Sequence, residues 1–260
     1  MLRKSAVCIA LASLALAVPA AQADSSPRAL PFFQDWSDVS LIAVSDDWSA
    51  VPGFVGHRGD GLVSSAGADP SAILAPGTGT PVQVIANQSN PNTLISGGVA
   101  EFELADPVVA LQGSSTADAP FLLLTLDTRG WRDIDVSYVV RDLDASMDDA
   151  VQPLALQYRL GGSGDFVNLA SAFVADATAG SAAGLATPVS LRLPAAAAGA
   201  ALLELRFITA NAAGNDEWIG VDSISLTGSP VASVPEPGEW MLMLSGLGLL
   251  GFTLRRRLAS

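Results

Sequence analysis

The sequence predicts an all-β fold, an antiparallel β-sandwich of jelly-roll type. Short segments in which every second residue is apolar recur along the chain, and this period places alternate side chains on opposite faces of a sheet. Clusters of Gly, Asp and Asn, such as 161–165 and 210–216, separate these segments and are typical of turns. Short strands spaced in this way favour a sandwich.

The first predicted strands lie at 81–88 and 100–112, between Pro, Asn and Gly residues. Segment 120–128 is a continuous apolar run, which indicates a strand buried on both faces. Segment 133–144 alternates instead, with apolar residues predicted to face inward and polar residues outward: Ile134, Val136, Tyr138 and Val140 against Asp135, Ser137 and Arg141.

Three further strands are predicted at 154–160, 188–194 and 202–209. In the first, the inward residues are Leu154, Leu156, Tyr158 and Leu160, and the outward residues are Gln157 and Arg159. The alanine-rich stretch 194–205 is the one rival for a helix, but Gly199 interrupts it, so we predict a loop that leads into a strand. Segment 64–80, rich in Gly, Pro, Ser and Ala, is predicted to be a long surface loop.

The N-terminus has the three parts of a secretory signal. Arg3 and Lys4 precede an apolar run over 7–18, and Ala21 and Ala23 are small residues of the kind that a signal peptidase requires. We therefore predict a signal peptide over 1–23, cleaved before Asp24. An uncleaved anchor is the alternative, but the run falls short of the roughly 20 residues that span a bilayer.

The body of the chain, 24–233, is expected to be one domain. Cys8 is the only cysteine and lies inside the predicted signal, so this body is held by its core without disulfides. It contains no lysine, and it carries eight of the 13 basic and 24 of the 26 acidic residues, a formal net charge of −16. Such a charge repels phosphate backbones, so the body is not expected to bind nucleic acid.

The C-terminus combines three features: Val234-Pro235-Glu236-Pro237, an uncharged run over 240–254, and Arg255, Arg256 and Arg257. We predict a single transmembrane helix over 240–254, short but workable in a thin bilayer, with the arginines on the cytoplasmic side. A buried C-terminal helix of the body is the alternative.

This order of features, over 234–260, resembles a PEP-CTERM sorting signal. The resemblance implies a Gram-negative bacterial protein that is handled by an exosortase, which would cut near the Pro-Glu-Pro. After transient anchorage in the inner membrane, the body would reach the cell surface or the extracellular matrix.

The body carries a second resemblance, over segments 40–62, 109–128, 151–169, 173–178 and 214–228. In collinear order, they are similar to a secreted bacterial β-sandwich module. That module is found N-terminally in large extracellular proteins, some with endonuclease/exonuclease/phosphatase or lamin-tail-like domains. The resemblance implies the fold but no activity, since fold alone does not determine function.

Two groups of acidic residues are candidates for a calcium site, because calcium prefers several oxygen ligands. One is a loop after a predicted strand and the other flanks the last strand: Asp142, Asp144, Asp148 and Asp149, and Asp216, Glu217 and Asp222. Met147 and Pro153 occupy the places where an EF-hand needs Gly and Glu, so the loop is not an EF-hand. Solvated hairpin tips are the alternative for both groups.

His57 is the only histidine and is expected to be a solvated loop residue. Arg58-Gly59-Asp60 is interpreted as part of a glycine-rich turn and not as an adhesion motif.

The leading functional hypothesis is a non-enzymatic surface or matrix module that binds polysaccharide. Trp36, Trp48, Trp131 and Trp218 are available for a sugar-binding face, although tryptophans in a sandwich are also core residues. The alternatives are a binding accessory to an extracellular enzyme and a carboxylate-based hydrolase.

Overall fold

The computed structural model describes residues 22–77, 79–145, 150–180, 182–232, 241–248 and 255. Several predicted features lie outside the described residues: most of the signal peptide with Ala21, the motif Val234-Pro235-Glu236-Pro237, the acidic residues Asp148 and Asp149, and the arginines Arg256 and Arg257.

Two sheets form the body. In the larger one, of seven strands, the order is β13–β10–β15–β8–β7–β6, and β3 also pairs with β15. Its strands are β3 (Phe32–Gln34), β6 (Ile85–Gln88), β7 (Gly98–Phe102), β8 (Val108–Gln112), β10 (Trp131–Asp142), β13 (Ala186–Arg192) and β15 (Ile219–Pro230).

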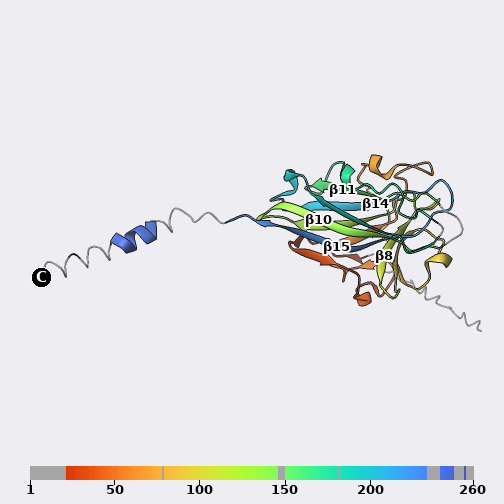
Figure 1. Cartoon of the computed structure of the whole chain (residues 1–260), viewed down its shortest axis with the longest axis horizontal. Helices are drawn as coiled ribbons and strands as arrows, with labels where there is room; N and C mark the ends of the chain where they lie inside the picture. The colour runs from red at the N-terminus through yellow and green to blue at the C-terminus, as the bar shows by residue number, and fades with distance from the viewer. Residues whose placement is uncertain are drawn as a thin grey trace, which may run out of the picture.

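The second sheet, of six strands, has the order β12–β11–β14–β9–β2, and β5 also pairs with β9. Its strands are β2 (Arg28–Ala29), β5 (Phe54–His57), β9 (Phe121–Asp127), β11 (Ala155–Leu160), β12 (Val167–Asn168) and β14 (Leu203–Ile208). Figure 1 shows β11 and β14 in one layer and β10, β15 and β8 in the other.

Most strand pairs are antiparallel, which confirms the predicted antiparallel sandwich. The parallel pairs are β2–β9, β6–β7 and the small pair β1 (Gln22–Ala23) with β4 (Asp47–Trp48). Short 3₁₀ helices lie in the connections: η1 (Val39–Ile42), η2 (Pro70–Ala72), η3 (Pro91–Thr93), η4 (Ala170–Ala172) and η5 (Ala195–Ala197).

The core lies between the two sheets. Tyr138 of β10 and Phe207 of β14 meet edge to face across it, with ring centroids 5.0 Å apart. Strand β10 follows the predicted alternation, because Ile134, Val136, Tyr138 and Val140 are all buried. Strand β9 is buried on both faces over most of its length, as the continuous apolar run 120–128 predicts.

Two predicted orientations on β11 are wrong. Leu160, which was predicted to face inward, is the last residue of the strand and is exposed. Gln157 of β11 was expected to face solvent, but it is fully buried, and so is Arg206 beside it on β14. The reason is the loop 64–80, which folds back over this face of the sheet. The Gln157 amide donates to the Pro70 and Ile73 carbonyls at 2.9 and 3.2 Å, so part of the predicted surface loop forms a lid on the sheet.

The alanine-rich stretch 194–205 forms the single turn η5 and then enters β14, close to the predicted loop and strand. Towards the C-terminus, residues 241–248 and 255 are helical. Within the part of the chain that the structure describes, no helix combines the length and apolar character needed to cross a membrane.

Candidate functional site

Three neighbouring strands bring their loops together at one end of the sandwich. Ile219, the first residue of β15, pairs with Asp142 at the end of β10 and with Leu111 near the end of β8. The segments that follow β8 and β10 and the segment that precedes β15 therefore meet at this end. They come from distant parts of the sequence.

These segments enclose a polar cleft of about 380 Å³. Amide, hydroxyl and carboxylate groups dominate its lining: Asn92, Ile95, Gln112, Gly113, Ser114, Ser115, Asp144, Gly214, Asn215 and Asp216. We call this the polar cleft.

Asp216, one of the residues that line the polar cleft, is held in place by two hydrogen bonds. Its Oδ1 accepts a hydrogen bond from the Ala212 amide at 2.6 Å, and its carbonyl accepts one from Gln112 Nε2 at 2.9 Å. Burial raises the pKa of the Asp216 carboxyl to about 6. A Cβ at Gly113 would overlap this carboxylate, so glycine is required for the close approach of the two loops.

The rim of the polar cleft is open to solvent. Asn92 and Ser115 are exposed, and Ile95 is 87% exposed beside them. Asn92 Oδ1 accepts a hydrogen bond from the Ala145 amide at 2.9 Å, which ties η3 to the segment after β10. Such a rim of amide and hydroxyl groups beside one apolar side chain suits a neutral polar ligand.

Strand pairing also brings together acidic residues that the sequence placed in two separate groups. Beyond the pair Asp142–Ile219, the Leu143 amide donates to the Trp218 carbonyl at 3.1 Å. One residue further, Asp144 falls opposite Glu217. Because side chains two residues apart share a face, Asp142, Asp144 and Glu217 lie together. We call these three residues the acidic corner.

Glu217 is the most deeply buried member of the acidic corner, 1% exposed. Burial, together with the nearby charges of Asp142 and Asp144, raises the pKa of its carboxyl to about 7. The Thr178 hydroxyl and the Ala150 amide lie near enough to favour its ionised form, but neither makes a hydrogen bond of normal geometry with it.

The remaining acidic candidates lie apart from the acidic corner. Asp222 lies on β15, where it accepts a hydrogen bond from Arg141 Nη1 at 2.8 Å. Burial raises the pKa of this carboxyl, and the Arg141 contact opposes the rise. Asp216 faces the polar cleft instead. Among the described residues, no three His, Cys, Asp or Glu side chains are placed to hold a metal ion by themselves, so calcium stays a prediction.

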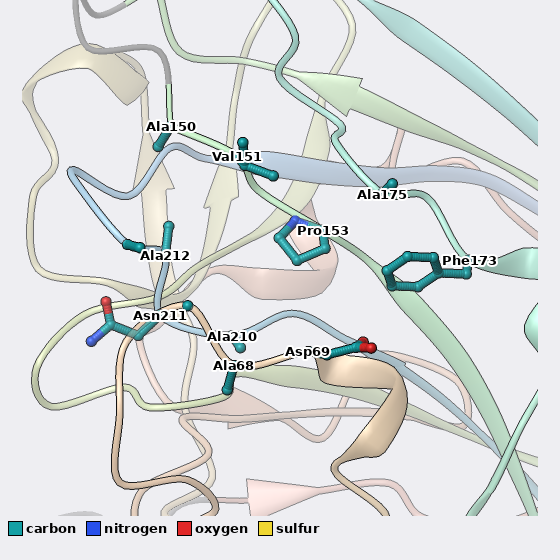
Figure 2. Close-up of a pocket in the computed structure, with 12 residues that line it drawn as sticks. Ala68, Asp69, Ala150, Val151, Pro153, Phe173, Ala175, Ala210, Asn211 and Ala212 are labelled. Atoms are coloured by element: carbon teal, nitrogen blue, oxygen red, sulfur yellow. The ribbon is translucent and has the colours of Figure 1, made fainter.

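A second cleft, of about 390 Å³, has an apolar lining. Figure 2 shows Pro153 and Phe173 facing Ala68 and Ala210 across it. Segment 210–213 lines this cleft and 214–216 lines the polar cleft, so one connection serves both. The apolar cleft offers few groups to orient a polar ligand.

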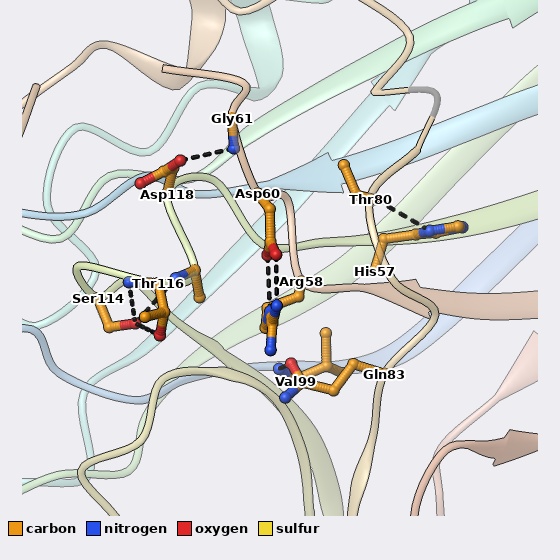
Figure 3. A network of polar contacts seen from close by, with 11 residues as sticks. His57, Arg58, Asp60, Gly61, Thr80, Gln83, Val99, Ser114, Thr116 and Asp118 are labelled. Atoms are coloured by element: carbon orange, nitrogen blue, oxygen red, sulfur yellow. Dashed lines mark hydrogen bonds and ion pairs between the residues drawn. The ribbon is translucent and has the colours of Figure 1, made fainter. Parts of the chain in front are cut away.

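His57 is not the solvated loop residue that was expected. It lies in β5, where its ring stacks on Phe121 with centroids 4.7 Å apart, and its Nδ1 lies 3.2 Å from the Thr80 hydroxyl. Burial lowers the pKa of its imidazole. Its neighbour Arg58 forms an ion pair with Asp60 (Figure 3). The first and third residues of the tripeptide 58–60 thus pair with each other, in agreement with a structural turn.

Three of the four candidate tryptophans belong to the core. Trp36, Trp48 and Trp218 are buried, and their indole N–H groups donate to the carbonyls of Val221, Gln83 and Leu94 at 2.8, 3.0 and 2.7 Å. Trp131 is partly buried against the same core. A sugar-binding face built on Trp36, Trp48 or Trp218 is therefore excluded.

Residues 233–257 match the family model of the PEP-CTERM protein-sorting motif. This match confirms the sorting signal that the C-terminal residues resemble. It covers the tail alone and assigns no family to the body. No curated protein matches the chain significantly.

Solved structures align with this chain at low similarity. The non-crystalline-cellulose-specific carbohydrate-binding module CBM28 is 14% identical, with 55% of this chain and 88% of that chain covered and a TM-score of 0.36. The xylan-binding module CBM15 is 10% identical, with 70% and 94% covered and a TM-score of 0.36.

The enzymatically active domain of tailspike protein 4 from bacteriophage CBA120 is 12% identical, with 56% of this chain and a TM-score of 0.32. The alignment covers only 18% of the length of that solved domain. At these scores none of the three alignments supports an inference about a ligand. The resemblance to modules of nuclease-type extracellular proteins stays a prediction.

Proposed function

We propose that this is an exported cell-surface or extracellular-matrix protein, sorted by an exosortase, whose sandwich binds a polysaccharide without catalysing a reaction. The match of residues 233–257 to the PEP-CTERM motif is the single observation that supports export and sorting by an exosortase. Signal peptidase removes 1–23 during export, and the tail holds the protein transiently in the inner membrane until the exosortase acts on it.

The polar cleft supports the proposed binding of a polysaccharide. Sugar hydroxyls both donate and accept hydrogen bonds, and the amides and hydroxyls of Asn92 and Ser115 do the same. Ile95 at the rim offers an apolar contact for the carbon face of a sugar ring. Since the body carries a net charge of −16, it repels polyanions, and the proposed ligand is a neutral glycan.

A binding test uses the purified full-length protein with a panel of neutral polysaccharides in pull-down and glycan-array formats. Ser115→Trp fills the polar cleft, and because Ser115 is exposed the change leaves the core intact. The matched control is Ser163→Trp, at an exposed position in the turn between β11 and β12. We expect binding at least about tenfold weaker in Ser115→Trp, a change of about 1.4 kcal/mol, and unchanged binding in the control.

Two outcomes would contradict this function. Undiminished binding by Ser115→Trp would show that the ligand binds elsewhere. The absence of binding to every polysaccharide in the panel would reject a neutral glycan as the ligand. Release of soluble sugar that is lost in a folded Asp216→Asn variant would instead identify a carboxylate-based hydrolase. If binding is confirmed and an extracellular enzyme is retained on the same polymer only with this protein present, the protein is a binding accessory to that enzyme.

A further inference from the structure

Glu217 is a buried carboxylate whose charge the protein does not neutralise. Its side chain is 1% exposed, and both Oε1 and Oε2 lack a hydrogen-bond donor. Among the described residues, no arginine forms an ion pair with it. A carboxylate in this position costs free energy unless it is protonated or meets a cation.

Two further carboxylates lie near Glu217, and their charges raise the free-energy cost of an ionised Glu217 that has no cation beside it. The pairing of β10 with β15 places Asp142 and Asp144 on the same face as Glu217, at the point where β10 ends and β15 begins. Asp142 Oδ1 accepts a hydrogen bond from the Asp144 amide at 3.1 Å, and this bond fixes the two aspartates relative to each other. Strand pairing and this hydrogen bond therefore set the positions of the three residues of the acidic corner relative to one another.

The chemistry of the acidic corner selects the class of cation. Carboxylate oxygens are hard ligands, and the corner contains no cysteine or histidine, which zinc and copper sites favour. Calcium accepts irregular sets of six to eight oxygens from carboxylates, backbone carbonyls and water, whereas magnesium demands near-ideal octahedral geometry. The irregular loops at this end of the sandwich therefore suit calcium better than magnesium.

We propose that the acidic corner, Asp142, Asp144 and Glu217, binds a calcium ion, with Glu217 as its buried anchor. The three carboxylates do not surround an ion by themselves, so the coordination is completed by backbone carbonyls and water. Asp144 also lines the polar cleft, so the ion braces the loops that form that cleft. This inference goes beyond the proposed glycan binding and does not depend on it.

Thermal unfolding of the full-length protein in EDTA and in increasing calcium tests the site. A ligand that binds only the folded state raises the melting temperature by about 5 to 10 °C at a hundred times its dissociation constant, for a domain of this size. The weakest extracellular calcium sites have dissociation constants of about 1 mM. No shift at about 10 mM calcium would overturn the proposal.

Glu217→Gln removes one charge at nearly constant volume, and Glu103→Gln is the matched control at an exposed position. We expect the control to keep the full calcium shift. Glu217→Gln should lose it while melting in EDTA at or above the wild-type temperature, because a buried charge is gone. If calcium raises the melting temperature of both Glu217→Gln and Asp144→Asn as much as that of the wild type, calcium binds elsewhere and the site is rejected. Asp144→Asn decides alone if Glu217→Gln does not fold.

Terbium luminescence locates the ion. Terbium occupies calcium sites and is excited by energy transfer from a nearby tryptophan, and Trp218 is the direct neighbour of Glu217. We expect tryptophan-sensitised emission that calcium competes away, and that Trp218→Phe greatly reduces while the calcium-induced melting shift persists. Sensitised emission that is unchanged in both Trp218→Phe and Glu217→Gln would contradict this location.

Discussion

The guanidinium of Arg206 lies over the ring of Phe166, with Cζ 3.9 Å from the ring centroid. Arg206 is fully buried, and it donates Nε to Gln157 Oε1 at 2.8 Å and Nη1 to the Ala75 carbonyl at 2.7 Å. Burial lowers the pKa of this group to about 9, so it is still a cation at neutral pH. One side chain thus joins β14 to the loop that covers it.

We predict that Arg206→Ala lowers the free energy of unfolding by about 3 to 5 kcal/mol, because buried acceptors on Gln157 and on the covering loop lose their donor. Urea denaturation measures this loss. Arg192→Ala is the control, since Arg192 pairs with Asp135 on the exposed face of β10 and β13 and should change stability little. Equal stability of the two variants would contradict the role of Arg206.

The same residue shows why the sequence predicts strands better than it predicts what covers them. Period-two patterns follow from backbone geometry, so β10 and β14 could be located from sequence. Whether a polar residue on the second face meets solvent or a loop depends on a contact between distant segments, here 70–75 with β11 and β14. No local pattern signals that contact.

The turn at Gly59 provides a second prediction. Gly59 and Gly61 both have left-handed φ angles, +76° and +69°, but a Cβ at Gly59 would overlap the Ala119 carbonyl, whereas a Cβ at Gly61 meets open space. Gly61→Ala should cost about 1 kcal/mol from backbone strain alone. Gly59→Ala should cost about 1 to 3 kcal/mol more, because the packed loop must move.

The difference between the two alanine variants in chemical denaturation isolates the contact with Ala119, because both share the backbone strain. If Gly59→Ala is as stable as Gly61→Ala, the tripeptide 58–60 is not packed as described. It would then be open to the adhesive interpretation.

His57 gives a prediction about pH. Burial lowers its folded-state pKa below the usual value of 6.5, so the unfolded chain takes up the proton first as the pH falls. The stability contributed by neutral His57 is fully present above pH 6.5 and is lost as the pH falls through 6.5 towards the folded pKa. The difference in unfolding free energy between wild type and His57→Gln should therefore decrease over this window.

Because the chain has one histidine, NMR titration of its ring measures the folded pKa directly. A value below 6.5 agrees with the stack on Phe121. A value at or above 6.5 would show that the ring is solvated, as the sequence alone led us to expect.

The candidate site could be predicted only in part. Acidic residues were identified at Asp142, Asp144 and Glu217, but the sequence assigned them to two groups, because the register of β10 against β15 is a long-range property. The polar cleft was missed. Its residues Asn92 and Ser115 lie in ordinary turn sequences, and only the meeting of the loops makes them a site.

If this chain is an exported protein with a removable sorting tail, mass spectrometry of the mature protein will detect both cuts. We expect protein recovered from the cell surface or the medium to begin at Asp24 and to lack the residues after Pro237. Intact protein recovered from the cytoplasm, from Met1 to Ser260, would contradict this expectation.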